Sequence, residues 1–224
     1  MAVRENRFQE MLAVEQELRE SGCRAVCGVD EAGRGPLAGP LVAAAVMVPW
    51  PCPWMGLTDS KKLTPRSRER WYRVIMSLAA AVGVGLISAR RIDRIGLQQA
   101  NWEAMCSAVT NLPVAPDHVV VDGPWNVPLL DLPQTPLVRG DGRAISVAAA
   151  SVVAKVTRDR MMIRLDSEFP GYGFARHKGY GTPEHLSALA ARGPCRIHRR
   201  SFHPVAALMN REEGSNHQGP AATV

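Results

Sequence analysis

Gly28-Val29-Asp30-Glu31-Ala32-Gly33-Arg34-Gly35-Pro36 is the stretch of this sequence that decides the fold and indicates the chemistry. Residues 24–29 predict a buried strand, which would present Asp30 and Glu31 at its end. Carboxylates collected at one point suit a hard divalent cation, and an arginine between two glycines suits a phosphate-bearing partner. The combination indicates metal-dependent chemistry on nucleic acid.

Two other interpretations of this stretch are a nucleotide-binding loop and an ordinary hairpin with surface acids. The apolar run 41–48 predicts a second strand where a nucleotide-binding loop needs a helix, and no phosphate-loop Lys-Ser or Lys-Thr pair follows. The hairpin stays an alternative, because turns commonly collect Gly, Asp and Pro. Since adjacent residues of a regular strand point to opposite faces, we expect the strand to end or bulge at Asp30 and Glu31.

The composition indicates a single intracellular domain with a nucleic-acid partner. A chain of 224 residues can bury one sizeable core, and we find neither an apolar run that could span a bilayer nor a secretory signal. The five cysteines form no Cys-x-x-Cys pair, which predicts reduced thiols and a cytoplasmic location. The net charge of +6 favours nucleic acid as the partner.

Positive charge is concentrated between Arg176 and His203. Glu184 is the only acid in this stretch, and four of the six histidines of the chain fall within it. We expect the stretch to follow the phosphates of a bound duplex, with Lys178 and Arg199 in contact. A solvated basic face is the alternative.

Hydrophobic periodicity predicts one α/β domain preceded by a short helical segment. We expect strands at 24–30, 41–48, 82–88, 118–121 and near 137, and helices at 7–20, from 64, at 96–112, at 145–169, from 183 and at 202–209. The segment 49–54, with three prolines, predicts a loop. The expected units are a helical lead-in at 1–23, the main domain at 24–210 and a disordered polar tail at 211–224.

Two further carboxylates are candidates for the site. Asp122 ends the apolar run 119–121, which places it at the tip of a buried strand, although an Asp before Gly-Pro also caps turns. Ser151, Lys155 and Asp159 follow one another at i, i+4 and i+8, so they share one face of a helix. The alternative for this face is an exposed ion pair between Lys155 and Asp159.

Two basic loops carry candidate substrate contacts. Lys61 and Lys62 stand directly before the expected helix from residue 64. Tyr180 stands in the loop 177–182, between two glycines and next to Lys178. Aromatic faces among cations stack on bases or sugars, whereas a solvated turn and a tyrosine at the core edge are the plainer alternatives.

Taken together, these motifs resemble bacterial ribonuclease HII, of the type 2 ribonuclease H family. They are, in the family's order, residues 28–36, 59–63, 121–123, 150–159, 177–182 and 198–202. The resemblance implies an α/β ribonuclease H-like fold, with a central mixed five-stranded sheet flanked by helices and a helical C-terminal part. It would make the main domain the catalytic domain of a monomer.

The resemblance also implies hydrolysis of the phosphodiester 5′ to a ribonucleotide, leaving 5′-phosphate and 3′-hydroxyl ends. The substrates would be RNA in RNA–DNA hybrids and single ribonucleotides in duplex DNA. Two Mg²⁺ or Mn²⁺ ions would serve the reaction, held by Asp30, Glu31, Asp122 and Asp159. The loop 33–35 would read the 2′-hydroxyl, and Tyr180 would stack on the adjoining deoxyribose. The full set of expected substrate-binding residues is Gly33, Arg34, Gly35, Lys61, Lys62, Ser151, Lys155, Lys178, Tyr180 and Arg199.

Three alternatives to this interpretation differ in class. A ribonuclease HIII-like enzyme would carry an extra N-terminal domain, for which the residues before the core are too few. A non-catalytic nucleic-acid-binding module would gain by losing negative charge beside phosphates, which disagrees with an intact set of acids. An unrelated metal-binding structural protein would leave the basic stretch and Tyr180 unexplained.

Overall fold

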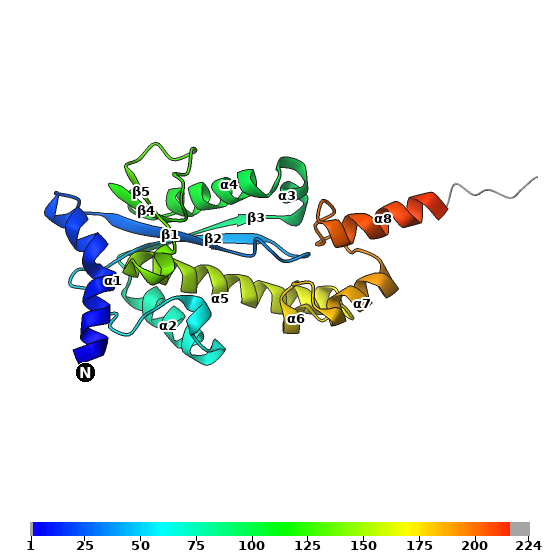
Figure 1. Cartoon of the computed structure of the whole chain (residues 1–224), viewed down its shortest axis with the longest axis horizontal. Helices are drawn as coiled ribbons and strands as arrows, with labels where there is room; N and C mark the ends of the chain where they lie inside the picture. Colours follow the sequence, from blue (N-terminus) through cyan, green and yellow to red (C-terminus); the bar gives the residue numbers. More distant parts are fainter. Residues whose placement is uncertain (1, 216–224) are drawn as a thin grey trace, which may run out of the picture.

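A mixed five-stranded sheet forms the centre of the molecule (Figure 1). The computed structural model describes residues 2–215. Along the sheet the strands run in the order β3-β2-β1-β4-β5, with β1 and β2 antiparallel, β2 and β3 antiparallel, and β1, β4 and β5 parallel. Their bounds are β1 Val26–Ala32, β2 Leu41–Met47, β3 Ala81–Ile87, β4 His118–Asp122 and β5 Gln134–Leu137. The expected fold class is confirmed.

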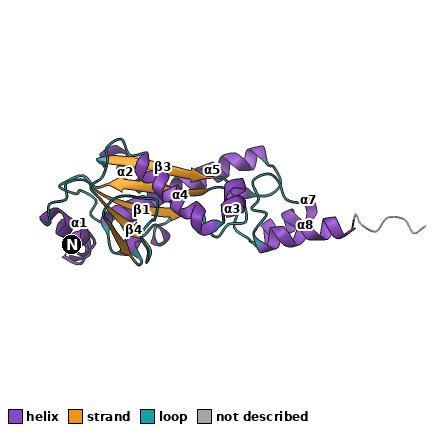
Figure 2. Ribbon diagram, turned by 90° about the horizontal axis from the view of Figure 1, so that it is seen from above, coloured by secondary structure: helices purple, strands orange, loops and turns teal. Residues whose placement is uncertain are grey.

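Helices cover both faces of the sheet (Figure 2), and each face has its own apolar core. On one face, α3 (Ala89–Ile95) and α4 (Leu97–Thr110) pack on β1, β2 and β3. The approach of α4 is close: a Cβ at Gly85 would lie 2.0 Å from the carbonyl oxygen of Ala104. A side chain at this strand position would therefore push the helix off the sheet.

The other face is covered by α1 (Ala2–Glu20), α2 (Pro65–Leu78) and α5 (Ile145–Glu168). The α5 helix lies along β1, and a Cβ at Gly28 would be only 2.3 Å from its backbone at Val147. The alanines of its first half are fully buried, so the helix approaches the sheet closely. This contact fixes the position of α5 relative to the end of β1.

The C-terminal part is helical, as expected, and comprises α6 (Phe174–His177), α7 (Pro183–Arg192) and α8 (His203–Ser215). Two fully buried arginines connect it to the loop after β1. Arg158 donates to the carbonyl oxygens of Pro40, Ala38 and Lys178, at 2.9, 3.1 and 3.0 Å. These bonds join the sheet, α5 and the C-terminal part into one framework.

Three parts of the structure differ from the expected elements. The helix expected at 96–112 is present as α4, but the separate helix α3 before it was not expected; Gly96, with a φ of 82°, ends α3 and begins α4. The short α6 was not predicted. The tail expected from residue 211 begins later, since α8 continues to Ser215, and 216–224 lie outside the described residues. Among residues 2–215, no helix has the length and apolarity needed to cross a bilayer.

Candidate active site

Three of the expected acids meet on the neighbouring strands β1 and β4, at the point where β4 ends. Val29 of β1 pairs with Val121 of β4, so the next residue of each parallel strand, Asp30 and Asp122, lies at the same edge of the sheet. Glu31 follows on β1 and interacts electrostatically with both. The expectation that the strand ends or bulges at Asp30 and Glu31 is wrong, because β1 continues to Ala32 and keeps a regular register with β2.

The three acids share an environment that disfavours their ionised forms. Burial, together with the charges of Glu31 and Asp122, raises the pKa of Asp30 well above its usual range. Burial raises the pKa of Glu31, with Arg34 opposing and Asp122 adding to the shift. The pKa of Asp122 is raised by burial and by a fourth carboxylate, Asp141. Such a cluster gains most from a bound cation.

Asp141 was missed in the sequence analysis. It lies in a short 3-10 turn, Gly140–Gly142, between β5 and α5, and is buried. The Lys61 ammonium donates to its Oδ2 at 3.0 Å, while the backbone N–H of Gly140 donates to Asp122 Oδ1 at 2.7 Å. An acid between two glycines, after a strand and before a buried helix, was a usable signal.

Asp159 is not brought to this group, and the expected convergence of Asp30, Glu31, Asp122 and Asp159 is wrong in this one residue. Asp159 accepts from Lys155 at 2.8 Å and lies 3.8 Å from Arg68. It does share a helix face with Ser151, as predicted. However, eight residues of α-helix separate the two by about 12 Å along the axis, and only Ser151 reaches Asp30.

The carboxylate oxygens of the cluster are of the kind that binds a divalent metal, although they do not yet form a complete metal site. In the described part of the chain, no three Asp, Glu, His or Cys side chains already stand as metal ligands. The oxygens of Asp30, Glu31, Asp122 and Asp141 are nevertheless the hard ligands that Mg²⁺ and Mn²⁺ prefer. Lys61 supplies nearby positive charge. Burial lowers its pKa, but the hydrogen bond to Asp141 and the charges of the surrounding acids together outweigh this and raise it.

Most of the expected substrate residues surround one cavity of about 290 Å³ beside the acids. Gly33 has a φ of +99°, and Gly35 lies under the ring of Tyr180, where a Cβ would be 3.7 Å from its Cε1. Tyr180 is exposed. The predicted residues that line this cavity are Asp30, Glu31, Gly33, Arg34, Gly35, Lys61, Asp122, Ser151, Lys155 and Tyr180.

A cation and hydroxyls complete the walls of this cavity. The Lys155 ammonium lies 5.8 Å from the centre of the Tyr180 ring, and behind the wall the buried Arg158 guanidinium lies 5.9 Å from the same ring. The hydroxyls of Ser60 and Ser151 lie 2.9 Å apart, and Ser151 also bonds the Asp30 carboxyl. A polar wall that links α5 to the acids therefore follows from the helix face predicted for Ser151 and Lys155.

Three expected substrate residues lie elsewhere. Lys62 is exposed and is not part of the cavity wall. Lys178 is half-buried, its ammonium donates to the carbonyl of Ala175, and burial lowers its pKa. Arg199 is fully buried and donates to the carbonyl oxygens of Gly33 and Arg34 at 2.6 and 2.8 Å. It supports the loop 33–35 from below and cannot meet a phosphate from that position.

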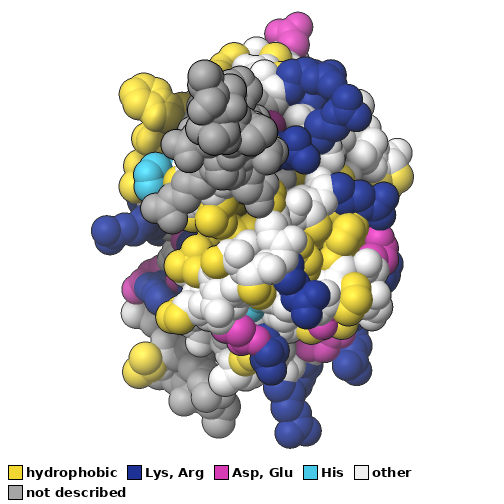
Figure 3. All heavy atoms as spheres, turned by 90° about the vertical axis from the view of Figure 1, so that its right-hand side faces the viewer, with side chains coloured by type: hydrophobic (Ala, Val, Ile, Leu, Met, Phe, Trp, Pro, Cys, Tyr) yellow, Lys and Arg dark blue, Asp and Glu magenta, His cyan; other side chains and the backbone are white. Residues whose placement is uncertain are grey.

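The basic stretch 176–203 as a whole does not form the expected phosphate track. Arg176 pairs with Glu184, and Arg196 pairs with Glu168 at 3.0 Å. The histidines 177, 185 and 198 are buried together. Figure 3 shows the end of the molecule near the C-terminal helices, where Lys and Arg side chains lie in separate groups. The number of positive charges in the sequence therefore overstated the number of cationic side chains that are available to bind phosphates.

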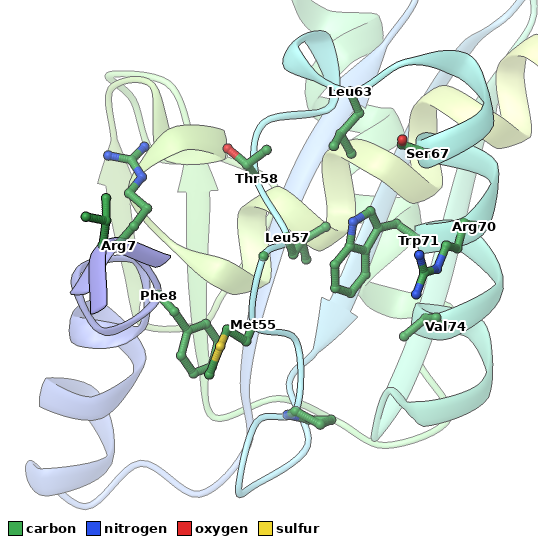
Figure 4. Close-up of a pocket in the computed structure, with 13 residues that line it drawn as sticks. Arg7, Phe8, Met55, Leu57, Thr58, Leu63, Ser67, Arg70, Trp71 and Val74 are labelled. Carbon is green, nitrogen blue, oxygen red and sulfur yellow. The ribbon is translucent and has the colours of Figure 1, made fainter. Parts of the chain in front are cut away.

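A larger cavity, of about 820 Å³, lies away from the acids (Figure 4). It is bounded by α1, the loop after β2 and α2, with Phe8, Leu57 and Trp71 in its wall. No carboxylate belongs to the described residues that line it. We therefore place the chemistry at the smaller cavity, where the carboxylates and the loop 33–35 meet.

Comparisons with known proteins identify the family. The family model for ribonuclease HII matches residues 27–205. A ribonuclease HII of Geobacillus kaustophilus is 49% identical over 93% of this chain and 80% of its own, and one of Geobacter metallireducens is 53% identical over 85% and 89%. The solved ribonuclease H2 of Pyrococcus horikoshii superposes with a TM-score of 0.73 at 26% identity, over 85% of this chain and 99% of that one. The chain belongs to the ribonuclease HII family, the metal-dependent hydrolases that cut the RNA of RNA–DNA hybrids.

Proposed function

We propose that this enzyme cuts on the 5′ side of a ribonucleotide, both in RNA–DNA hybrids and at single ribonucleotides embedded in duplex DNA. The products would be a 5′-phosphate and a 3′-hydroxyl. The observation that carries the proposal is one cavity lined by buried acids, by the glycine-flanked loop 33–35 and by the exposed ring of Tyr180. It combines a place for metal-dependent hydrolysis with groups able to recognise a sugar.

In this proposal the metal-holding residues are Asp30, Glu31, Asp122 and Asp141, with Asp141 in the place first given to Asp159. Bound Mg²⁺ or Mn²⁺ would supply an activated water and stabilise the leaving oxygen. Ser151 orients the Asp30 carboxyl through its hydrogen bond. The Lys61 ammonium pairs with Asp141 and balances the negative charge. Because its side chain is largely exposed, it can turn toward a phosphate.

Recognition of the ribonucleotide would come from the backbone of the loop 33–35. The 2′-hydroxyl both donates and accepts hydrogen bonds, and backbone groups at Gly33 and Gly35 can approach it without side-chain interference. Tyr180, over Gly35, would stack on the deoxyribose of the neighbouring nucleotide. Arg199 donates hydrogen bonds to the carbonyl oxygens of Gly33 and Arg34 from the buried side of the loop. These bonds fix the direction in which the other backbone groups of the loop point.

We further propose that the enzyme acts as a monomer in the cytoplasm. All five cysteines are free thiols in the structure, which agrees with a reducing compartment. The acids argue for an enzyme over a silent binding module. A module that only bound phosphates would be weakened by a cluster of negative charge in its groove.

The test uses a labelled duplex with one ribonucleotide, Mg²⁺ or Mn²⁺, and mapping of the cut. Loss of a residue that only supports a metal ligand lowers activity roughly 10–100-fold. We expect Asp141→Asn to reduce the cleavage rate by more than this, while duplex binding stays intact or improves. Asp159→Asn is the matched control. It breaks the ion pair with Lys155 in the cavity wall but removes no metal-holding acid, so it should reduce the rate by less than about tenfold.

Two results would contradict the proposal. If Asp159→Asn abolished cleavage and Asp141→Asn did not, the metal-holding set would be the one first expected from the sequence. If the parent enzyme bound the duplex but left it intact with either metal, the protein would act as a binding module.

A further inference from the structure

A second cavity, of about 310 Å³, opens beside the acids on the side away from Tyr180. It shares Glu31, Arg34 and Asp122 with the active-site cavity, so the acids lie between the two. Tyr180 and Lys155 line only the first cavity. The second is completed by α4 and by the turn after β4, through Asn101, Trp102 and Trp125 among others.

Trp125 is the most exposed tryptophan of this region. It stands three residues after Asp122, and 71% of its surface is accessible. Its ring lines both the second cavity and an adjoining hollow, whose wall includes Trp102, Pro124 and Pro136. The hollow is open and predominantly apolar in its wall, so an aromatic or sugar face placed against Trp125 would be enclosed on one side only. Exposed aromatic rings beside a nucleic-acid path are stacking platforms.

Asn101 gives a second, independent indication of a ligand. It is 3% exposed and lines the second cavity. Its amide N–H donates to Glu31 Oε2 at 3.5 Å. The amide oxygen is buried and has no hydrogen-bond partner among the described residues. A buried acceptor without a donor is costly to a protein, so a bound group that donates to it would be favoured.

Gln98 of α4 lines the second cavity and contacts Arg34, which lines both cavities. Its side-chain oxygen accepts from the Arg34 guanidinium at 3.1 Å, and both residues line the second cavity. The arginine of the loop 33–35 is thereby directed toward α4, and it also lies 3.7 Å from Glu31. Arg34 therefore belongs to the boundary that the two cavities share, and Trp125 belongs to the second cavity alone.

We propose that the second cavity is a nucleotide subsite of the same enzyme. It would hold the nucleotide of the cut strand that flanks the ribonucleotide on the side opposite Tyr180. Trp125 packs on the face of that nucleotide, and the Asn101 carbonyl accepts a hydrogen bond from one of its N–H or O–H groups. The inference rests on the proposed function, because the acids fix where the cut strand passes.

The first test compares Trp125→Ala and Trp125→Phe with the matched control Trp50→Ala, a partly exposed tryptophan that does not line either cavity. Stacking on an aromatic ring is worth enough that its removal weakens binding by roughly tenfold. We expect Trp125→Ala to raise KM for a single-ribonucleotide duplex by about that factor with a smaller change in kcat. Trp125→Phe should restore most of the loss, and Trp50→Ala should behave as the parent.

The second test identifies the donor. KM is measured for two pairs of duplexes that differ only in the flanking nucleotide. In the first pair its base is adenine or purine, which lacks the exocyclic amine; in the second pair its sugar is deoxyribose or ribose. The parent should discriminate within one of these pairs. Asn101→Leu should lose that discrimination. The readout is a ratio within one variant, so a general loss caused by the neighbouring Glu31 does not affect it.

Binding is followed separately by tryptophan fluorescence, with duplex titrated in the presence of a chelator so that no cutting occurs. The parent and Trp50→Ala should be quenched, and Trp125→Phe should lose most of that signal. Unchanged KM in Trp125→Ala, together with quenching that persists in Trp125→Phe, would overturn the subsite while leaving the proposed function intact. Absence of cleavage in the parent would instead contradict the proposed function.

Discussion

Arg199 shows how a single residue can serve the site without touching substrate. Its guanidinium is fully buried and donates to the carbonyl oxygens of Gly33, Arg34 and Gly39. Burial lowers its pKa to about 9, with Arg158 nearby adding to the shift. The charge is retained at neutral pH because the carbonyls compensate for lost water. The loop 33–35 is therefore held by an internal support, which only an arginine can supply with this many donors.

Replacing Arg199 distinguishes a residue that supports the loop 33–35 from one that binds a phosphate. Arg199→Lys should lower the free energy of unfolding by about 3 kcal/mol or more, because at least two charge-assisted hydrogen bonds are lost. Urea denaturation measures the change. The salt dependence of duplex binding should stay at the parent slope, whereas loss of a phosphate contact would reduce it by about one unit.

The neighbouring exposed residue is the control for this experiment. Arg200→Lys should leave the stability of the protein unchanged, since the backbone N–H of Arg200, and not its side chain, bonds Asp93. A stable Arg199→Lys protein with a reduced salt slope would return Arg199 to the phosphate contact first expected.

The residues of the site were predictable where they end apolar runs. Asp30 and Asp122 each follow buried valines, and parallel neighbouring strands bring such ends together. Asp159 was expected at the site because helical spacing gives the face of a residue. It does not give the height of that residue relative to the sheet. The height depends on the close contact of α5 with Gly28, which is a property of the packed structure.

At the level of elements, α5 depends on α1 for its N-terminal cap. The residue before the helix is Ala144, which has no side chain to cap it. Glu15 of α1 takes this role: its Oε1 accepts from the backbone N–H and the hydroxyl of Ser146, at 2.8 and 2.6 Å. The helix that carries Ser151 and follows Asp141 is thus anchored by the N-terminal helix. The lead-in at 1–23 was predicted as helical, but its capping role was not visible in the sequence.

Burial of this cap makes the stability of the protein depend on pH. Desolvation raises the pKa of Glu15 above 4.5, against the hydrogen bonds from Ser146. A carboxyl whose pKa is raised on folding contributes most below its unfolded pKa, and the contribution is lost as the pH rises through the folded pKa. Glu15→Gln keeps the acceptor and removes the titration. Its stability relative to the parent should therefore increase as the pH rises above about 4.5.

Thermal or urea unfolding over a pH series measures this difference, in which the titration of the active-site acids cancels. Glu17→Gln, at an exposed position of the same helix, should show no such trend. Glu15→Ala also removes the titration, so it should show the same trend, but at a stability about 1 kcal/mol below that of Glu15→Gln, the usual cost of a missing cap. A Glu15→Gln protein that tracks the parent in parallel would mean that the carboxyl titrates normally.

Across the whole molecule, the C-terminal part is held by a chain of neutral histidines. The rings of His177 and His185 stack at 4.5 Å. His185 Nδ1 lies 2.9 Å from the Tyr180 carbonyl and so donates to it, which leaves its Nε2 to accept from His198 Nε2 at 3.1 Å. His198 Nδ1 in turn accepts from the backbone N–H of Cys195 at 3.0 Å. Every ring nitrogen along this path is satisfied only when both rings are uncharged.

This arrangement connects the substrate side to the rest of the fold, because the chain of bonds begins at Tyr180. The sequence showed four histidines in a basic stretch, and pattern alone favoured a charged surface. Packing against Tyr172 and Phe174 buries three of them instead. Periodicity could not reveal this, since these contacts come from short, irregular segments around α6 and α7.

Acid should therefore open the C-terminal part before the sheet. Burial, followed by the charge of His185, lowers the pKa of His198 from 6.5 to about 4, and burial lowers that of His185 as well. A histidine whose pKa is depressed on folding stabilises fully above its unfolded pKa, and that contribution is lost as the pH falls from 6.5 toward the folded pKa. A second proton would also place two N–H groups face to face between His185 and His198.

Hydrogen exchange at about pH 7 and about pH 5, corrected for the intrinsic rate, tests this. Amides of α6 and α7 should lose protection at the lower pH, while β1 and β2, which contain no histidine, serve as the internal reference. In His198→Gln the loss should be smaller, because glutamine can donate and accept without gaining charge. Cleavage of a single-ribonucleotide duplex should fall over the same range more steeply in the parent than in this variant, since Tyr180 lies at the end of the chain of bonds. Equal loss of protection in the sheet and the helices would mean that acid unfolds the molecule as one unit and that the histidines do not set its weakest point.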